Sequence, residues 1–345
     1  MTTNPTTVVQ GTPPRGHRLQ LVYPLCAVTL LAMALLSLAL GSVVIPFETT
    51  FKALLGLGEG SYAQHIILQF RLPKMLTALC VGSALAVSGM LMQTLFRNPL
   101  AGPHILGISS GASLGAAIAI LAGGLLIANS PLSLALSAWL GAMAMLTIIM
   151  AASLRLKRNS TLLILGVLLG AAASSGVSIL QYIGNNQALK SFVIWGMGSL
   201  ANVTGHSLQI LFACTLIGIG LTLCCLRGLN VLLLGEAQAN ALGLPMRQIR
   251  LLVFLATSIL AGTSTALCGP IGFIGIAVPH LVRKMLGTVR HGPLLAGCLL
   301  VGPIAMLLAD LIAQLPGSNL TLPLNAVAAL LGLPIVMHIL LVGDR

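Results

Sequence analysis

The sequence has very few charged and aromatic residues. Of its 345 residues only 6% are charged and 4% aromatic, whereas 57% are hydrophobic, and the mean hydropathy is +1.04. An ordinary soluble domain contains about 25% charged residues. So low a charged fraction excludes a soluble globular protein, because its surface could not be covered, and the hydrophobic content excludes a disordered chain. The long apolar runs predict an all-α polytopic membrane protein.

Acidic residues and ligand-binding motifs are also scarce. There are 5 Asp and Glu against 17 Lys and Arg, a net charge of +12. The basic residues are scattered between apolar runs, so they form no continuous stripe for nucleic acid, and membrane lipid is the expected partner. The sequence has no P-loop and no C-x-x-C pair among its seven cysteines. We therefore expect no catalytic residue, no metal site and no bound cofactor in this chain, and hence no enzyme.

Ten runs are apolar and long enough to cross a membrane, for which about 20 residues are needed. The shortest is the eighth, which Gly and Pro interrupt, and a further short helix over 188–198 is expected not to cross. Residues 1–18 form a predicted N-terminal tail, and residues 19–345 a single transmembrane domain. The predicted spans are 19–44, 72–96, 105–127, 132–154, 161–183, 206–226, 248–268, 271–287, 293–315 and 324–342.

Glycine is abundant where charge is rare, with 38 residues. It recurs at a spacing of four in GASLG (111–115) and GVLLG (166–170). Small residues at this spacing let membrane helices approach closely, because lipid tails provide no hydrophobic force between helices. The pattern predicts a tightly packed bundle and by itself indicates no function.

The distribution of the basic residues predicts the orientation. An even number of spans puts both termini on one side, and with the N-terminus inside, 13 of the 17 Lys and Arg lie in inner segments. Cytoplasmic loops carry such an excess. We therefore expect a multi-pass membrane protein with both termini in the cytoplasm. Four basic residues remain on the outer side, namely Lys52, Arg71, Lys74 and Lys190.

The longest inner loop, residues 230–250, contains a short helical pattern near 236–242. Glu236 suits its first turn, Gly243 suits the position just after its end, and Pro245 prevents continuation. Such a helix is either a simple connection between two spans or a docking element for another chain on the cytoplasmic side.

Arg71 and Lys74, in RLPK, lie at the outer start of the second predicted span, where positive charge is unusual. Their side chains either reach lipid headgroups or form a basic patch for an acidic partner outside. Glu48 and Glu59 are close enough in sequence to pair with them and would then weaken the second interpretation.

Asp310 is the only acidic residue inside a predicted span. An acid within the membrane is typical of ion-coupled secondary carriers, where it relays protons. The simpler interpretation is a polar residue near a helix end, hydrogen-bonded to its neighbours. A secondary carrier that uses Asp310 is the alternative to a transporter driven by ATP, whose ATPase would have to be a separate chain.

Several long motifs resemble one family. They are RLPKMLTALCVGSALAVSGMLMQTLFRNPLAGPHILGISSGASLG (71–115), WGMGSL (195–200), LLLGEAQANALGL (232–244), GPIGFIGIAVPHLVR (269–283), ADLIAQ (309–314) and LPLNAVAALLGLPIV (322–336). Together they resemble the FecCD-type permeases of bacterial ABC importers, over nearly the whole chain after the first span. The resemblance implies the type II ABC importer architecture and a homodimer. It also implies cytoplasmic ATPase subunits that bind ATP and Mg²⁺, and a periplasmic or lipid-anchored binding protein. The implied cargo is a ferric siderophore, haem or cobalamin.

The resemblance also implies roles for individual residues. Arg71 and Lys74 would meet the binding protein, and an inner constriction would be formed by Asn98, Leu100, Asn159 and Ser160. The coupling helix near 232–244 would contact the ATPase through Gly235, Glu236, Ala237, Ala241, Leu242 and Gly243. No docking role is assigned near 317–321, because Thr321 and Gly102 stand where many relatives are acidic and Asn325 replaces a frequent Gly.

Polar residues line one face of the fifth predicted span. Ser174, Ser178 and Gln181 follow one another at steps of four and three, so they share a helix face. They either line the path of a bulky chelate or, for the serines, bond to carbonyls of their own helix.

Overall fold

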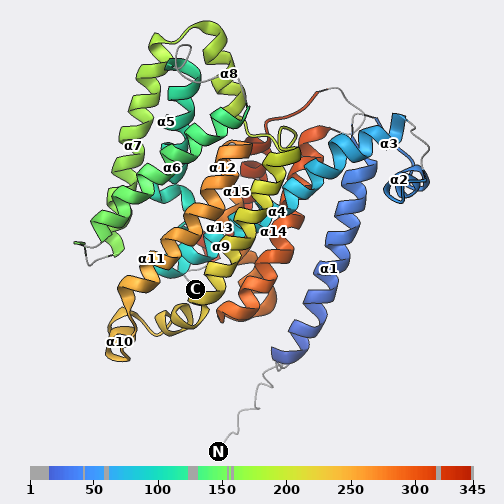
Figure 1. Cartoon of the computed structure of the whole chain (residues 1–345). Helices are drawn as coiled ribbons and strands as arrows, with labels where there is room; N and C mark the ends of the chain where they lie inside the picture. The colour runs from blue at the N-terminus through green and yellow to red at the C-terminus, as the bar shows by residue number, and fades with distance from the viewer. Residues whose placement is uncertain are drawn as a thin grey trace, which may run out of the picture.

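The computed structural model describes residues 15–41, 43–57, 62–122, 131–153, 155–156, 159–315 and 320–342, and these residues contain helices and no strand. Each of the ten predicted spans corresponds to a helical segment, which confirms the all-α membrane fold (Figure 1). Seven described segments are long and apolar enough to cross a membrane, and Ile108–Ala122 and Leu324–His338 are shorter apolar helices. The remaining predicted span, the eighth in chain order, corresponds to the helix Ile274–Leu286, which has 13 residues.

The helices in chain order are α1 (Arg15–Ala39), α2 (Phe47–Leu54), α3 (Tyr62–Ile66), α4 (Leu72–Leu95), α5 (Ile108–Ala117), α6 (Pro131–Ser153), α7 (Asn159–Ile183), α8 (Asn186–Gly196), α9 (Gly205–Leu232), α10 (Glu236–Ala241), α11 (Met246–Thr257), α12 (Thr263–Cys268), α13 (Ile274–Leu286), α14 (His291–Gln314) and α15 (Leu324–Val342). Turns of π-helix at Ile67–Arg71, Ile118–Ala122 and Ser258–Gly262 join or extend them, and a 3₁₀ turn at Pro103–Leu106 precedes α5.

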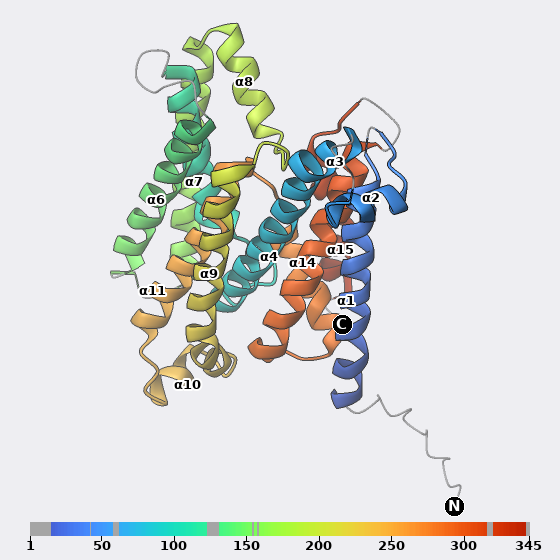
Figure 2. The same cartoon turned by 45° about the vertical axis from the view of Figure 1, so that its right-hand side comes forward.

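Helix α4 forms the centre of the bundle and is buried over most of its length. It packs against α9, α13 and α14 (Figure 2). Two glycine pairs bring the backbones together: a Cβ on Gly82 would lie 2.5 Å from the carbonyl oxygen of Gly302, and one on Gly89 only 1.6 Å from that of Gly275. These contacts exclude any larger residue at Gly82 and Gly89, because the helix backbones touch there.

The predicted glycine motifs also lie at helix contacts. Gly111 and Gly115 of α5 face α6, where a Cβ on them would lie 2.5 Å from the Gly141 oxygen and 2.0 Å from the Ser137 oxygen. Gly170 of α7 lies opposite Ser110 and Gly107. With α8, these helices form the lobe at the upper left of Figure 1.

The prediction for the second span was wrong at its outer end. The helix starts at Tyr62 rather than near 72 and continues through the π-helical turn into α4, so Tyr62–Leu95 is one segment of 34 residues. Pro73 lies one residue after the predicted start at 72. It occupies the first turn of α4, directly after the wider π turn, so the backbone continues although Pro73 donates no hydrogen bond. Arg71 and Lys74 therefore lie within a continuous helix.

The start of α1 and helix α10 lie at one end of the molecule, and α2, α3 and α8 at the other (Figure 1). We call these the inner and outer ends. The first helix ends at Ala39, five residues before the predicted limit, and the expected short helix near 188–198 is α8, whose first turn is capped by the Asn185 side chain accepting a hydrogen bond from Ala188 N–H at 2.7 Å. The tail residues 1–14 lie outside the described part.

Candidate functional site

Helix α10 is a short helix with a glycine in a left-handed conformation at each end. Gly235 precedes it with φ of +108°, and Gly243 follows it with φ of +77°. The N–H groups of Gly243 and Leu244 donate to the carbonyls of Asn240 and Ala239, both at 3.0 Å. This is the double hydrogen bond of a Schellman motif, for which a glycine at the first position after the cap is typical. The predicted end of the helix and the role of Gly243 in it are confirmed.

The exposed surface of α10 combines small or apolar residues with the polar side chains of Gln238 and Asn240. Ala237, Ala241, Leu242 and Gly243 are all exposed, Leu242 to 67%, and no membrane-spanning run surrounds them. The carboxylate of Glu236 does not belong to this surface, because it lies 3.3 Å from Nη2 of Arg250 on α11. Glu236 thus fixes α10 to the next helix. Gly235 is buried, so the exposed contact surface consists of the other four predicted residues.

The predicted inner constriction is only partly described. Asn98 forms a local turn, in which its Oδ1 accepts a hydrogen bond from Leu100 N–H at 2.9 Å. The 3₁₀ turn that follows packs on α7, where a Cβ on Gly107 would lie 3.2 Å from the Gly166 oxygen. The chain after Asn98 therefore reaches the helix that starts at Asn159. The side chains of Asn159 and Ser160 lie outside the described part of the structure.

The serines of α7 bond to their own helix. The Oγ atoms of Ser174 and Ser178 donate to the carbonyls of Gly170 and Ser174 at 2.9 and 3.1 Å. Both residues are nevertheless exposed on the surface of this single chain, as is Ser175, and Gln181 is half-buried. A hydroxyl that already donates to its helix still accepts hydrogen bonds. The stripe is therefore an exposed, weakly polar surface, and its role as a path remains a prediction.

At the outer end, the guanidinium of Arg71 binds the end of α1. It donates to the carbonyls of Leu38 and Ala39 at 2.7 and 2.8 Å and also to that of Val43. A helix leaves its last carbonyls without internal partners, so Arg71 caps α1. Glu48, which was expected near Arg71 and Lys74, instead pairs with Lys52 at 2.7 Å, and this hydrogen bond lowers the pKa of the Glu48 carboxyl.

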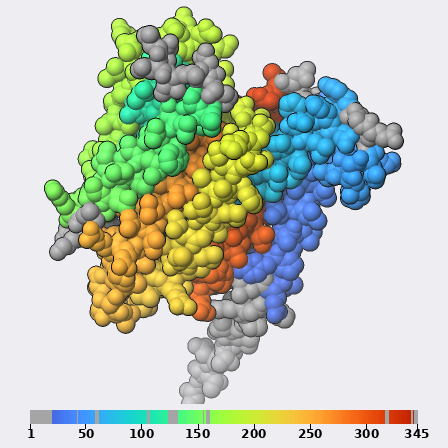
Figure 3. All heavy atoms as spheres, in the orientation of Figure 1, coloured from blue at the N-terminus to red at the C-terminus, as the bar shows by residue number. Residues whose placement is uncertain are grey.

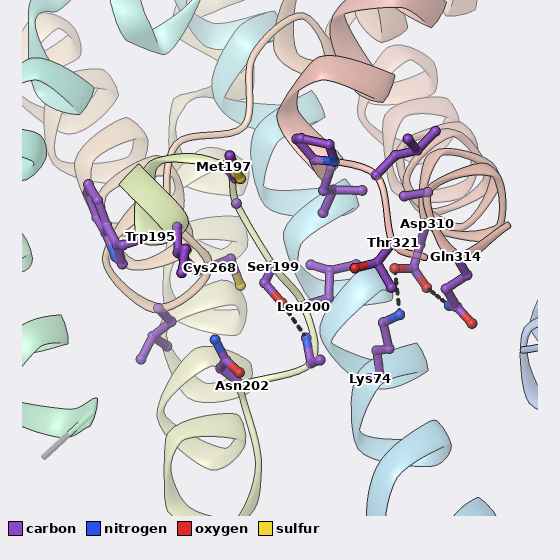
Figure 4. A pocket seen from close by; sticks show the side chains of 18 of the residues that line it. Lys74, Trp195, Met197, Ser199, Leu200, Asn202, Cys268, Asp310, Gln314 and Thr321 are labelled. Atoms are coloured by element: carbon purple, nitrogen blue, oxygen red, sulfur yellow. Dashed lines mark hydrogen bonds and ion pairs between the residues drawn. The ribbon is translucent and has the colours of Figure 1, made fainter. Parts of the chain in front are cut away.

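Lys74 and Asp310 form an ion pair between α4 and α14. Lys74 Nζ lies 2.9 Å from Asp310 Oδ1, and Gln314 Nε2 donates to Oδ2 at 2.6 Å. The Asp310 side chain is 5% exposed and that of Lys74 is 21% exposed. The pair lines an outer cavity of about 490 Å³ together with the end of α8, the loop 197–202 and the segment before α15 (Figure 4). In Figure 3 the α5–α8 lobe and the α2–α3 segment rise on opposite sides of the outer surface.

Sequence reasoning missed this pairing, although both residues had been singled out. Lys74 was an outer cation in an unusual place, and Asp310 was the only acid in a span. The sequence signal that could have predicted the pair is that two rare, opposite charges both lie near the outer ends of their spans. Because Lys74 is paired with Asp310 and Arg71 binds the end of α1, neither cation is a free surface charge. The docking role of Arg71 and Lys74 remains a prediction.

Comparison with known proteins covers most of the chain. The sequence profile of the FecCD transport family matches residues 29–342. The chain belongs to this family. The vitamin B12 import system permease BtuC of Shigella flexneri is 40% identical over 278 residues, which are 80% of this chain and 84% of BtuC. The corresponding protein of Citrobacter koseri shares 40% identity, over 80% of this chain and 83% of its own length.

Solved structures agree with the family assignment. A metal-chelate type ABC transporter in an inward-facing conformation superimposes with a TM-score of 0.80 at 34% identity, over 93% of this chain and 99% of that chain. PsaBC from Streptococcus pneumoniae, in complex with Fab, is only 14% identical with a TM-score of 0.53 over 83% and 94% of the two chains, and shows a shared fold alone. This FecCD permease is therefore a subunit of an ABC importer and is not an enzyme.

Proposed function

We propose that this permease forms a homodimer in the bacterial inner membrane and imports a metal chelate of the corrinoid type. It works with two cytoplasmic ATPase subunits and a periplasmic or lipid-anchored binding protein. The observation that carries the proposal is helix α10, a capped helix at the inner end whose Ala237, Ala241, Leu242 and Gly243 are exposed. Four exposed small or apolar residues past the end of a span have no structural use in a single chain, whereas they fit a groove on an ATPase.

Several features support the individual partners. The exposed serine stripe of α7 suits contact with a second copy better than contact with lipid tails, because small residues allow close helix approach. The outer cavity gives a bulky cargo an entrance on the side of α8. The 40% identity to vitamin B12 permeases favours a corrinoid over a ferric siderophore or haem.

The ion-coupled carrier receives less support. A proton-relaying carboxylate must exchange protons freely, whereas Asp310 is buried, paired with Lys74 and hydrogen-bonded by Gln314.

Co-purification tests assembly and cargo together. The permease is expressed with the ATPase and the binding protein encoded beside it, and the binding protein is screened against cobalamin, ferric hydroxamates and haem. We expect a complex of two permeases and two ATPases, and a binding protein that prefers cobalamin. Preference for a ferric chelate would overturn the cargo assignment alone. Failure of any ATPase to co-purify would overturn the proposed coupling.

A further inference from the structure

The inner end of the bundle contains a pocket of about 270 Å³ that is lined by basic and neutral residues. We call it the inner basic pocket. Helices α4, α9, α13 and α14 meet there. Its lining residues are Gln93, Thr94, Arg97, Asn98, Pro99, Leu232, Leu233, Arg283, Val289 and His291. We propose that the inner basic pocket binds a phosphate group, either of an anionic phospholipid headgroup or of free phosphate.

The two arginines of the pocket are not neutralised within the described chain. Of the acidic residues there, Glu48, Glu236 and Asp310 are paired with Lys52, Arg250 and Lys74, respectively. Arg283 is half-buried, and its guanidinium donates to the neutral amide oxygen of Gln93 at 2.6 Å. Arg97 is exposed, with its guanidinium near Gly235. Two guanidinium groups at one pocket without a carboxylate are suited to an anion, and guanidinium is the group of choice for phosphate.

Arg97 also has an unfavourable backbone conformation. It follows the end of α4 with φ of +48°, in a Schellman motif in which Arg97 N–H and Asn98 N–H donate to the carbonyls of Thr94 and Gln93. Glycine is usual at that position because other residues are strained there. Strain of this kind is typical of functional sites. A glycine at this position would therefore relieve the backbone strain.

The helix ends around the pocket carry dipoles of both signs, because α14 begins there whereas α4, α9 and α13 end near it. His291, the first residue of α14, lines the pocket, so the positive end of that helix dipole faces it. The negative end of α4 is also present, but N–H groups of Phe96, Arg97 and Asn98 already occupy its terminal carbonyls. Buried His291 is held by Thr94 at 2.8 Å and by Asn230 at 2.9 Å, which preforms this wall.

The position of the pocket explains why a lipid is a suitable source of the phosphate. It lies where four helices end on the inner side, and the apolar lining residues Leu233 and Val289 are 41% and 57% exposed beside the arginines. A basic pocket between helices at the cytoplasmic side, with apolar surface next to it, matches the chemistry of an anionic headgroup and its glycerol ester. The inference does not depend on the identity of the cargo.

The test compares three variants of the purified permease in nanodiscs. Arg97→Gly combined with Arg283→Gln removes both charges, and its glycine relieves the strained turn, so the fold is kept. Arg97→Lys combined with Arg283→Lys keeps the charges. Arg155→Gln removes an exposed arginine that does not line the pocket. The wild type and each variant are placed in nanodiscs of three kinds: phosphatidylcholine alone, phosphatidylcholine with about 20% phosphatidylglycerol, and phosphatidylcholine with millimolar inorganic phosphate in the buffer. Melting temperature and retained lipid by native mass spectrometry are measured.

A ligand that binds only the folded state raises the melting temperature. We expect phosphatidylglycerol to raise it for the wild type and Arg155→Gln, to do so less for the lysine variant, and to have no effect on the Gly/Gln variant, with retained lipid following the same order. A shift with inorganic phosphate alone, lost in the Gly/Gln variant, supports the site with a soluble source. Equal shifts in all variants, or no shift in any of them, would overturn the proposal.

Discussion

At the scale of single residues, carboxylates are rare in this protein, and each one in the described part of the structure has a cationic partner. Among them Asp310 is the most buried, and the pair it forms with Lys74 joins the two helices that pack most closely at the centre of the bundle. Removing one partner of a buried pair costs more than removing both, because a lone buried charge remains.

Substitutions at this pair therefore have unequal effects. Lys74→Ala leaves the Asp310 carboxylate buried with only Gln314 as a partner, and we expect a loss of about 3 kcal/mol in stability. Asp310→Asn costs less, because Lys74 is partly exposed and can reach water. The double variant Lys74→Ala, Asp310→Asn should lose less than the sum of the two. Thermal unfolding in detergent measures all three, and strictly additive losses would show that the pair does not couple α4 to α14.

At the scale of elements, the local signals were sufficient where glycine and proline mark an end. Gly243 and Pro245 identified the end of α10, and the apolar runs identified all ten spans. The continuation of α4 upstream of Pro73 was missed, because a π turn has no sequence signature that distinguishes it from a helix start. The partners of Arg71 were equally invisible, since they are backbone carbonyls of α1 some thirty residues away.

Gly243 provides the test of α10 as a coupling element. A Cβ there would meet no atom within 4 Å, so Gly243→Val acts through its φ of +77° alone. The strain is about 1 kcal/mol or more, which corresponds to about fivefold weaker ATPase association if it falls on the docked conformation. Gly220→Val is the matched control, because Gly220 is equally open but lies within α9 with ordinary helical φ. Co-purified ATPase per permease is the readout, and equal yields from both variants would make α10 a mere connection.

At the scale of the whole molecule, the sequence composition and the motifs together predicted the membrane class, the bundle of ten helical segments and the family. They could not predict which distant groups meet. Lys74 and Asp310 are separated by 236 residues, and the inner basic pocket combines the ends of four helices. Such sites depend on helix rotation and depth in the bundle, which in turn follow from glycine contacts such as Gly82 with Gly302.

The central claim is that ATP hydrolysis by a partner chain drives import through this permease. It is tested most directly by uptake of radiolabelled cobalamin into sealed proteoliposomes that contain the permease and its ATPase, with ATP and Mg²⁺ trapped inside and the loaded binding protein outside. We predict uptake that requires all of these components and stops when ATP is replaced by a non-hydrolysable analogue. Uptake of the same cargo driven by a proton or sodium gradient, without ATPase and abolished by Asp310→Asn, would contradict the account.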